Sequence, residues 1–336
     1  MSKYPLVTIC VPTIGRTAML QETLISIYLQ TSKNYEVLIL DNASPADAQE
    51  VIHSYVNDEP RARVLRSAKR LHMFENFSRG IQAANGKYLT FFHDDDVYLP
   101  EFIRHHVSLL EANAHAGFSG SNCFVIDGLG HTIGKRDLIR KNDVCSGKRY
   151  IAALMGMGVN LFPMQSIMFR ASVLGPDTFN KSLEVNFSDF VILMRIAEKH
   201  NVGLIARPLM KMRNHQGQVS QGMKRREAIR LRTRLLSHYC SEFAVRWPNE
   251  RNFVRKLEQK VNRSRQTGLL WGWISSRTET ESRDCLLDLN KSPIEVGIRG
   301  LLTQVEEQGL SWARRQKFLM PYLRKIGYLI GKGGLV

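Results

Sequence analysis

Three consecutive carboxylates, Asp94, Asp95 and Asp96, are the residues of this chain whose types and spacing best suit chemistry. Like charges this close repel one another, and an uncompensated carboxylate among them has its pKa raised. A divalent cation would neutralise the group, and hard oxygen ligands suit Mg²⁺ or Mn²⁺ better than Zn²⁺. Such an ion usually shares its coordination shell with substrate phosphates. The tripeptide alone leaves one alternative open, a solvated acidic turn before a helix that begins near Pro100.

The carboxylates follow Tyr88 to Phe92, an apolar and aromatic run typical of a buried β-strand. Strand-like and helix-like segments alternate before it, which predicts an α/β fold with a doubly wound, mostly parallel sheet flanked by helices. In such sheets, ligands bind outside the carboxyl ends of the strands. The predicted strands are 6–11, 35–40 and 62–65, and the predicted helices are 17–30, with Thr17 as N-cap, 46–56 and 73–84.

Three predicted strand ends carry residues suited to binding: Pro12-Thr13, Asp41-Asn42 and Asp94 to Asp96. Their convergence at one edge favours the cation site over the acidic turn. The sequence has no G-x-G-x-x-G motif after the first strand and no GxxxxGK[ST] motif, which argues against a nicotinamide-binding domain and a P-loop NTPase. A metal ion is then the obvious means of neutralising a bound diphosphate.

The pattern beyond Pro100 predicts further strands and helices, among them a helix over 186–199 with Ser188 as its cap. Asp189 lies in the first turn of this helix, where the helix dipole favours a carboxylate, so by itself it indicates only a helix start. The chain is expected to be helical from 223 onward. The other predicted elements are helices at 100–114, 148–155, 224–245, 250–276, 293–305 and 311–330, strands at 117–126, 131–135, 163–169, 202–206 and 209–213, and a basic surface loop at 137–149.

Composition indicates a globular protein with a basic C-terminal third. The chain has 336 residues, 43% hydrophobic, and a net charge of +16, and residues 217–336 contain 23 Lys and Arg against 11 Asp and Glu. Five scattered cysteines without a CxxC pair argue against a disulfide framework and a structural zinc site, and suit a reducing compartment. We expect neither a signal peptide nor a membrane-spanning helix, because no apolar run reaches 18 residues.

Residues 5–220 resemble the family 2 glycosyltransferases of the GT-A fold. The resemblance rests on the order and spacing of five pieces: Val7–Thr13, Val37–Ser44, Ala84–Asp96, Asp189 at a helix start, and Arg213–His215. It implies a nucleotide-sugar glycosyltransferase domain over 1–220, followed by a basic helical C-terminal extension over 221–336. It also implies that a sugar moves, with inversion, from a nucleotide-diphosphate-sugar donor to a hydroxyl of a glycan or lipid-linked acceptor in bacterial polysaccharide or O-antigen assembly.

The resemblance also implies roles for individual residues. Two positions depart from the family pattern: His93 stands where an acid is common, which puts the carboxylate assignments in question by one residue, and Ser188 replaces the acid that often precedes the base. The implied catalytic base is Asp189, the implied donor-binding residues are Pro12, Thr13, Asp41, Asp94 and Arg213, and the implied ligands of Mn²⁺ or Mg²⁺ are Asp95, Asp96 and His215.

Two other functions remain as alternatives: a metal-dependent nucleotidyltransferase, and a basic binding protein of the same fold that has lost transfer activity. For residues 311–336, a peripheral contact with an anionic membrane and a solvated helical packing are both left open. Nucleic acid is not an expected partner, because the sequence contains no recognisable binding module. The expected location is the cytoplasm, at the inner face of the membrane if the membrane contact holds.

Overall fold

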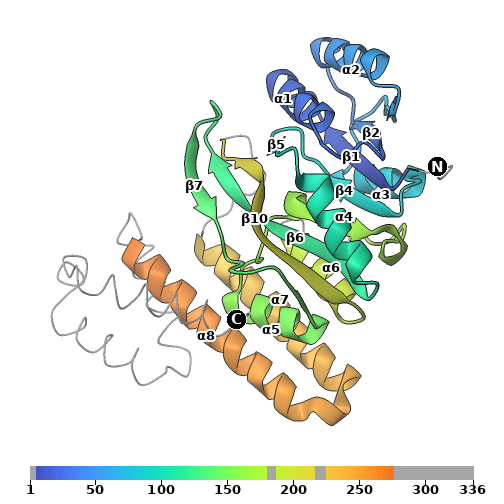
Figure 1. Cartoon of the computed structure of the whole chain (residues 1–336). Helices are drawn as coiled ribbons and strands as arrows, with labels where there is room; N and C mark the ends of the chain where they lie inside the picture. The colour runs from blue at the N-terminus through green and yellow to red at the C-terminus, as the bar shows by residue number, and fades with distance from the viewer. Residues whose placement is uncertain (1–4, 180–186, 216–224, 276–336) are drawn as a thin grey trace. The chain divides into compact units, whose positions relative to one another are not determined.

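The computed structural model describes residues 5–179, 187–215 and 225–275 (Figure 1). The chain divides into two compact units, the first made of 1–151 and 160–219 and the second of 152–159 and 220–336. This division differs from the predicted domains in assigning 152–159 to the second unit. The predicted helices at 293–305 and 311–330, and with them the segment considered for membrane contact, lie outside the described residues.

The first four strands form the parallel half of a large sheet in the first unit. β1 pairs with both β2 and β4, β2 pairs with β3, and all of these pairs are parallel. Their carboxyl ends therefore lie at the same edge of the sheet. The strands are β1 (Val7–Thr13), β2 (Tyr35–Asp41), β3 (Ala62–Val64) and β4 (Tyr88–Phe91), connected by α1 (Thr17–Tyr28), α2 (Ala46–Asp58) and α3 (Met73–Ala83).

The second half of the sheet mixes parallel and antiparallel strands. β10 runs parallel to β6, whereas β9, β7, β5 and β8 pair antiparallel with their neighbours. The strand order is β3-β2-β1-β4-β9-β6-β10-β5, with β7 beside β6 and β8 beside β10. The α/β prediction is confirmed, although the sheet is more mixed than expected. These strands are β5 (Val97–Tyr98), β6 (Ala116–Ile126), β7 (Thr132–Arg136), β8 (Asp143–Cys145), β9 (Ile167–Arg170) and β10 (Asn201–Arg213).

Several local predictions differ from the structure. Thr17 is the first helical residue of α1 rather than its N-cap, and its hydroxyl donates a hydrogen bond to Asp47 at 2.6 Å. The predicted loop 137–149 contains β8, because this segment adds to the edge of β10. Pro208 does not divide two strands but lies at a register irregularity within β10.

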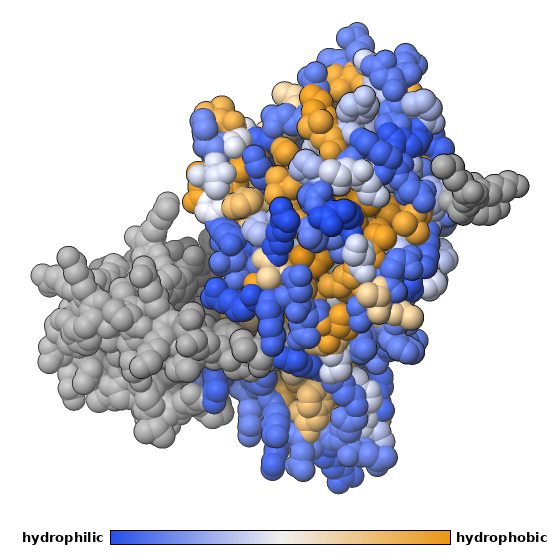
Figure 2. Space-filling model, in the orientation of Figure 1, coloured by the Kyte–Doolittle hydropathy of each residue, from blue (hydrophilic) through white to orange (hydrophobic). Residues whose placement is uncertain are grey.

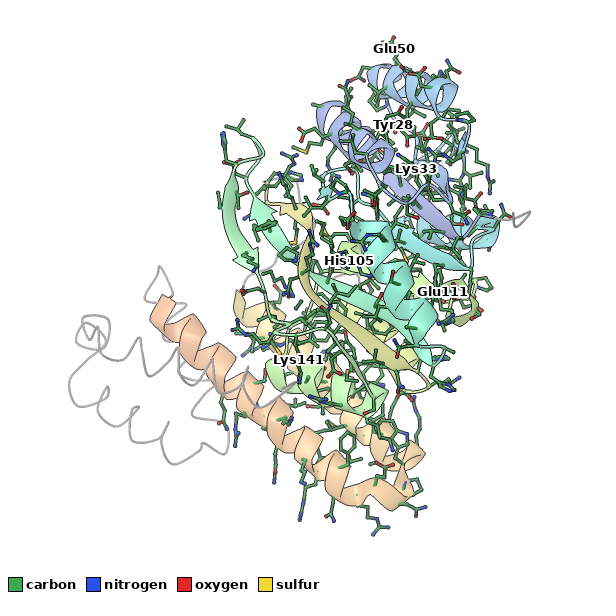
Figure 3. All side chains as sticks on the ribbon, viewed as in Figure 1. Tyr28, Lys33, Glu50, His105, Glu111 and Lys141 are labelled. Carbon is green, nitrogen blue, oxygen red and sulfur yellow. The ribbon has the colours of Figure 1, made fainter. Side chains whose placement is uncertain are left out.

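The core of the first unit lies on both faces of the sheet. β1 and β2 are almost wholly buried, as expected for strands covered by helices on both faces. Tyr28 stands at the exposed end of α1, where the Lys33 ammonium lies 5.3 Å from the centre of its ring (Figure 3). The remaining helices of this unit are α4 (Phe102–Ala112), the first part of α5 (Gly147–Met157) and α6 (Ser188–Ala197).

The described part of the second unit consists mainly of α7 (Arg225–Arg246) and α8 (Arg251–Ser275). A short turn that begins at Pro248 joins them. Their buried side chains include Leu236, Phe243 and Leu257, whereas the surface of these helices in view is mostly hydrophilic (Figure 2). Among the described helices, none combines the length and the apolar composition that a membrane span requires.

Candidate functional site

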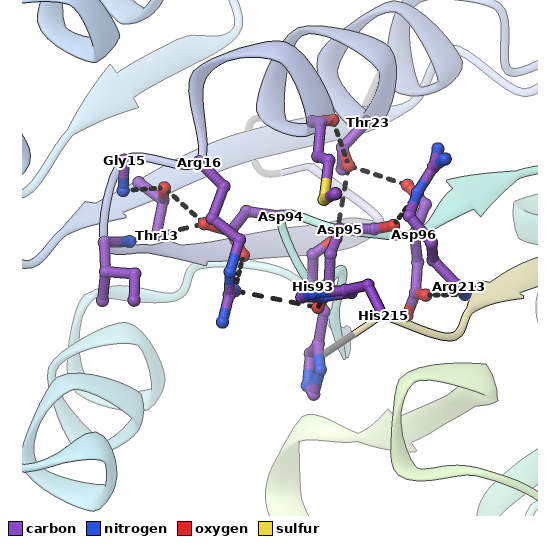
Figure 4. Close-up of polar contacts among 12 residues, drawn as sticks. Thr13, Gly15, Arg16, Thr23, His93, Asp94, Asp95, Asp96, Arg213 and His215 are labelled. Atoms are coloured by element: carbon purple, nitrogen blue, oxygen red, sulfur yellow. Dashed lines mark hydrogen bonds and ion pairs between the residues drawn. The ribbon is translucent and has the colours of Figure 1, made fainter. Parts of the chain in front are cut away.

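The carboxylates occupy the loop between β4 and β5, and α1 fixes that loop (Figure 4). The Thr23 hydroxyl of α1 donates a hydrogen bond to the main-chain oxygen of Asp96 at 2.7 Å. The Tyr98 hydroxyl accepts from the main-chain N–H of His93 at 3.0 Å. Because both bonds engage the main chain of the loop, the side chains of 93–96 project from a fixed backbone.

His93, Asp95 and Asp96 bring three ligand atoms within 4.8 Å of one another. His93 Nε2 and Asp96 Oδ2 are buried and make no hydrogen bond to another described residue. Burial raises the pKa of Asp96 well above its usual value, and the Asp95 charge adds to this effect. Burial lowers the pKa of His93, although the charges of Asp95 and Asp94 act to raise it. The lowered pKa favours the neutral imidazole, which is the form that binds metals. The buried free ligand atoms and the crowded negative charge fit a divalent cation.

Two cationic or titratable side chains border this cluster from other elements. His215 Nε2, just beyond β10, lies 3.0 Å from Asp95 Oδ2. Arg16 Nη1 lies 2.8 Å from Asp94 Oδ1 and 3.7 Å from Asp95 Oδ2. Arg16 therefore compensates part of the carboxylate charge, at a position where an added cation would have to share Asp95 with it (Figure 4).

The residues predicted to hold a nucleotide lie at adjacent strand ends. Thr13 and Asp41 are register partners at the carboxyl ends of β1 and β2. Pro12 precedes Thr13 and pairs with Leu40. The Thr13 hydroxyl donates to Asp94 Oδ2 at 2.7 Å, which connects β1 to the carboxylate loop. Asp41 Oδ1 accepts from the main-chain N–H of Ser44 at 2.9 Å, and its Oδ2 lies 2.7 Å from Arg66 Nη1.

Arg213, at the end of β10, is buried and bonded to protein acceptors on several sides. Its side chain is only 1% exposed. Its main-chain N–H donates to Asp96 Oδ1 at 2.8 Å, and its Nε donates to the main-chain oxygen of Asp95 at 2.9 Å. Its Nη2 lies 2.6 Å from Glu22 Oε2 on α1. The guanidinium thus joins α1, β10 and the carboxylate loop, an arrangement that favours a structural role over the predicted contact with phosphates.

Asp189 belongs to a second set of contacts, at the start of α6. Its Oδ1 accepts from the main-chain N–H of Phe190 at 2.9 Å, and its Oδ2 accepts from the side-chain amide of Asn160. Burial raises the pKa of Asp189 to about 6, although the Phe190 N–H, the charge of Arg136 and the Asn160 amide all act to lower it. Ser188 is the first residue of α6 rather than its cap, since the N-cap position is Phe187.

The structure therefore brings most of the predicted residues into one contact network. Asp94 contacts Thr13 and Arg16, and Arg16 also lies near Asp95. Asp95 contacts His215 and Arg213, and Arg213 also contacts Asp96. The predicted site residues did not include His93 or Glu22, nor three other contacting residues, Arg16, Arg66 and Asn160. Arg16 could have been suspected from its place just after Thr13, whereas Arg66 and Asn160 stand in segments without a readable motif.

Comparison with other proteins identifies the family. Residues 8–171 match the sequence profile of glycosyl transferase family 2. An uncharacterized glycosyltransferase of Methanocaldococcus jannaschii is 24% identical over 258 residues, covering 75% of this chain and 83% of that protein. The GalNAc(5)-diNAcBac-PP-undecaprenol beta-1,3-glucosyltransferase of Campylobacter jejuni is 27% identical over 124 residues, covering 36% of this chain and 39% of that protein.

Two solved structures share the fold at low sequence identity. TarS residues 1–349 of S. aureus, in complex with UDP-GlcNAc, superimposes with a TM-score of 0.59 at 13% identity, covering 98% of this chain and 92% of that one. The mannosyltransferase PcManGT of Pyrobaculum calidifontis, in complex with GDP-Man and Mn²⁺, gives 0.54 at 15% identity, covering 98% and 86%. Residues 8–171 are therefore a glycosyltransferase family 2 domain, and the two solved structures share the fold of the chain.

Proposed function

We propose that this chain transfers a sugar, with inversion, from a nucleotide-diphosphate-sugar donor to a hydroxyl of a glycan or lipid-linked acceptor. The observation that carries the proposal is the convergence of His93, Asp95 and Asp96 with His215 at the carboxyl edge of the sheet. That edge is where ligands bind in sheets of this kind. Thr13 and Asp41, at the two adjacent strand ends, would contact the nucleotide.

The residues of the carboxylate loop fit Mn²⁺ or Mg²⁺. Asp95 and Asp96 supply oxygen ligands and His93 a neutral imidazole nitrogen, with His215 beside Asp95. A bound divalent ion would act as a Lewis acid that stabilises the negative charge of the departing nucleoside diphosphate. Arg213 holds the loop by its contacts with Asp95 and Asp96, and we assign it a positioning role.

Asp189 is the proposed general base. A base is most effective when its pKa lies near the working pH, and burial raises the pKa of Asp189 to about 6. Its carboxylate would take the proton of the acceptor hydroxyl as that oxygen attacks the anomeric carbon. One base facing one leaving group implies a single displacement, and therefore inversion of the anomeric configuration.

The named ligands and substrates of similar proteins support the donor and acceptor classes. TarS is solved with UDP-GlcNAc, and PcManGT with GDP-Man and Mn²⁺. The Campylobacter relative is named for an undecaprenol-diphosphate-linked acceptor. We accordingly place this chain in the assembly of a bacterial surface polysaccharide on the cytoplasmic side of the membrane, with a lipid-linked glycan as acceptor.

The experiment is calorimetric titration of the full chain with UDP, GDP, dTDP and CDP, each with and without Mn²⁺, and repeated on Asp95→Ala. We expect one nucleotide to bind tightly with Mn²⁺, and Asp95→Ala to abolish the metal-dependent part. Asp58→Ala is the matched control, because Asp58 is an exposed carboxylate at the end of α2. It should bind like the wild type.

The other outcomes decide among the alternatives. If no nucleotide binds under either condition, the carboxylate loop is not a donor site, and a basic binding protein becomes the better account. If a nucleotide binds but its sugar conjugates bind no better and are never turned over, while a nucleoside triphosphate is consumed, the chain is a nucleotidyltransferase.

A further inference from the structure

Three elements of the first unit meet around Asp189. Asp189 is the second residue of α6, Asn160 lies in the segment that follows α5, and Arg136 is the last residue of β7. These residues are far apart in the chain, and neither Asn160 nor Arg136 belongs to a motif that the sequence reveals. Their meeting is therefore a product of the fold.

The contacts form a chain from Arg136 to the carboxylate. The Arg136 guanidinium donates to the main-chain oxygen of Asn160, and the side-chain amide of Asn160 donates to Asp189 Oδ2. An ionised carboxylate is only an acceptor, so the amide has to present its NH₂ group to it. Asn160 is only 5% exposed, which fixes the amide in place. Each Asp189 oxygen thus holds one hydrogen bond, to Asn160 or to Phe190, and keeps acceptor capacity for a substrate hydroxyl.

Among the residues that the structure describes, Arg136 is the cation whose charge lowers the pKa of Asp189. Burial lowers the pKa of the Arg136 guanidinium, whereas the charges of Cys123 and Asp189 raise it. Tyr150 on α5 is buried, and its hydroxyl makes no hydrogen bond to another described residue. A buried carboxylate without Asn160 and Arg136 would be protonated over a wider pH range.

We propose that Asn160 and Arg136 are positioning residues for Asp189, with the Asn160 amide holding one carboxylate oxygen and Arg136 holding the Asn160 segment. The reaction they serve is the sugar transfer proposed above, and the inference rests on that function. Neither residue touches the reacting atoms. They keep Asp189 ionised and oriented, so that its remaining lone pairs face the acceptor hydroxyl.

The test is a titration of Asp189 that needs no donor or acceptor. The full chain is labelled with ¹³Cγ-aspartate, and the Asp189 signal is identified as the one that Asp189→Asn removes. We expect Asn160→Ala to raise the pKa of Asp189 by about one unit, because one hydrogen bond to the charged form is lost. Arg136→Lys keeps the charge but changes the donor geometry, and should produce a smaller upward shift. Asn113→Ala is the matched control. It removes a hydrogen bond from the Asn113 side-chain amide to the main-chain oxygen of Leu109 at the end of α4, and it should leave the Asp189 titration unchanged.

Asn160→Ser supplies a second, milder variant should Asn160→Ala fail to fold, and it should raise the same pKa. An Asp189 titration that is unchanged in the folded Asn160 variants, even with reduced stability, overturns the proposal. Because no donor is used, this result stands apart from the nucleotide titrations of the proposed function. Once a donor is known, Asn160→Ala should also move the acidic limb of the kcat/KM profile upward by about one pH unit while donor KM stays unchanged.

Discussion

Replacing Asp189 by Asn should stabilise the protein at neutral pH while removing transfer activity. Burial raises the pKa of Asp189 from 3.8 to about 6. Each unit corresponds to ~1.4 kcal/mol, so ionising this carboxyl in the folded state costs about 3 kcal/mol. Asn carries no charge and avoids this cost. It can accept only one of the two hydrogen bonds from Asn160 and Phe190, a loss of about 1 kcal/mol.

The pH dependence of the stability difference is the informative quantity. Below pH 3.8 the Asp189 carboxyl is protonated in both states, and Asp189→Asn should be slightly less stable than the wild type. As pH rises from 3.8 to about 6, the unfolded chain releases this proton first, so the wild type loses stability relative to the variant. Above about pH 6 the loss is complete, and the variant should be more stable by about 2 kcal/mol.

Urea unfolding of both proteins at pH values from 4 to 8 measures this difference. Asp58→Asn is the control, because it removes an exposed carboxylate at the end of α2. A stability difference between Asp189→Asn and the wild type that stays flat from pH 4 to 8 would refute the reasoning. It would mean that Asp189 has an ordinary pKa and is not a base tuned by burial.

Two further predictions concern the carboxylate loop. Arg16→Gln should tighten Mn²⁺ binding in the absence of nucleotide by roughly fivefold. The reason is that Mn²⁺ would no longer have to displace a partly buried ion pair of Arg16 with Asp94 and Asp95, which costs about 1 kcal/mol. A titration followed by Mn²⁺ electron paramagnetic resonance measures this affinity, and unchanged or weaker binding would show that Arg16 does not compete with the metal ion. Arg213→Met should lower the free energy of unfolding by about 2 kcal/mol, because the main-chain oxygen of Asp95 loses a buried donor, whereas the exposed Glu22 becomes solvated. Denaturant unfolding measures this, and a change under 0.5 kcal/mol, the scale of an ordinary surface substitution, contradicts the structural role.

The strand ends were predictable because they follow from hydrophobic patterning. Buried runs ending in Thr13, Asp41 and Asp94 place these residues at one edge of a parallel sheet by topology alone. The antiparallel β8 was missed because its basic segment shows no strand pattern, and it is a strand only through its pairing with β10. Tertiary pairing here overrides local preference.

Side-chain partnerships across the fold were not predictable. In the sequence, Arg213 is only a basic residue near a polar strand end. In the fold it is buried and bonds to Glu22, a residue on α1 nearly two hundred positions earlier. His93 reads as a departure from a run of acids, and only its buried ring nitrogen beside Asp95 and Asp96 indicates a ligand. Asn160 carries no signal in the sequence, because its significance comes from the contact with Asp189.

The central claim is that a metal and a nucleotide-sugar meet at the carboxylate loop. The most direct measurement is an anomalous difference map from crystals grown with Mn²⁺ and the nucleoside diphosphate chosen by calorimetry. We predict a Mn²⁺ peak in contact with Asp95 and Asp96, with the diphosphate bound to the same ion and the base beside Thr13 and Asp41. A nucleotide bound elsewhere, or a loop that holds neither ion nor diphosphate, would contradict the proposed function.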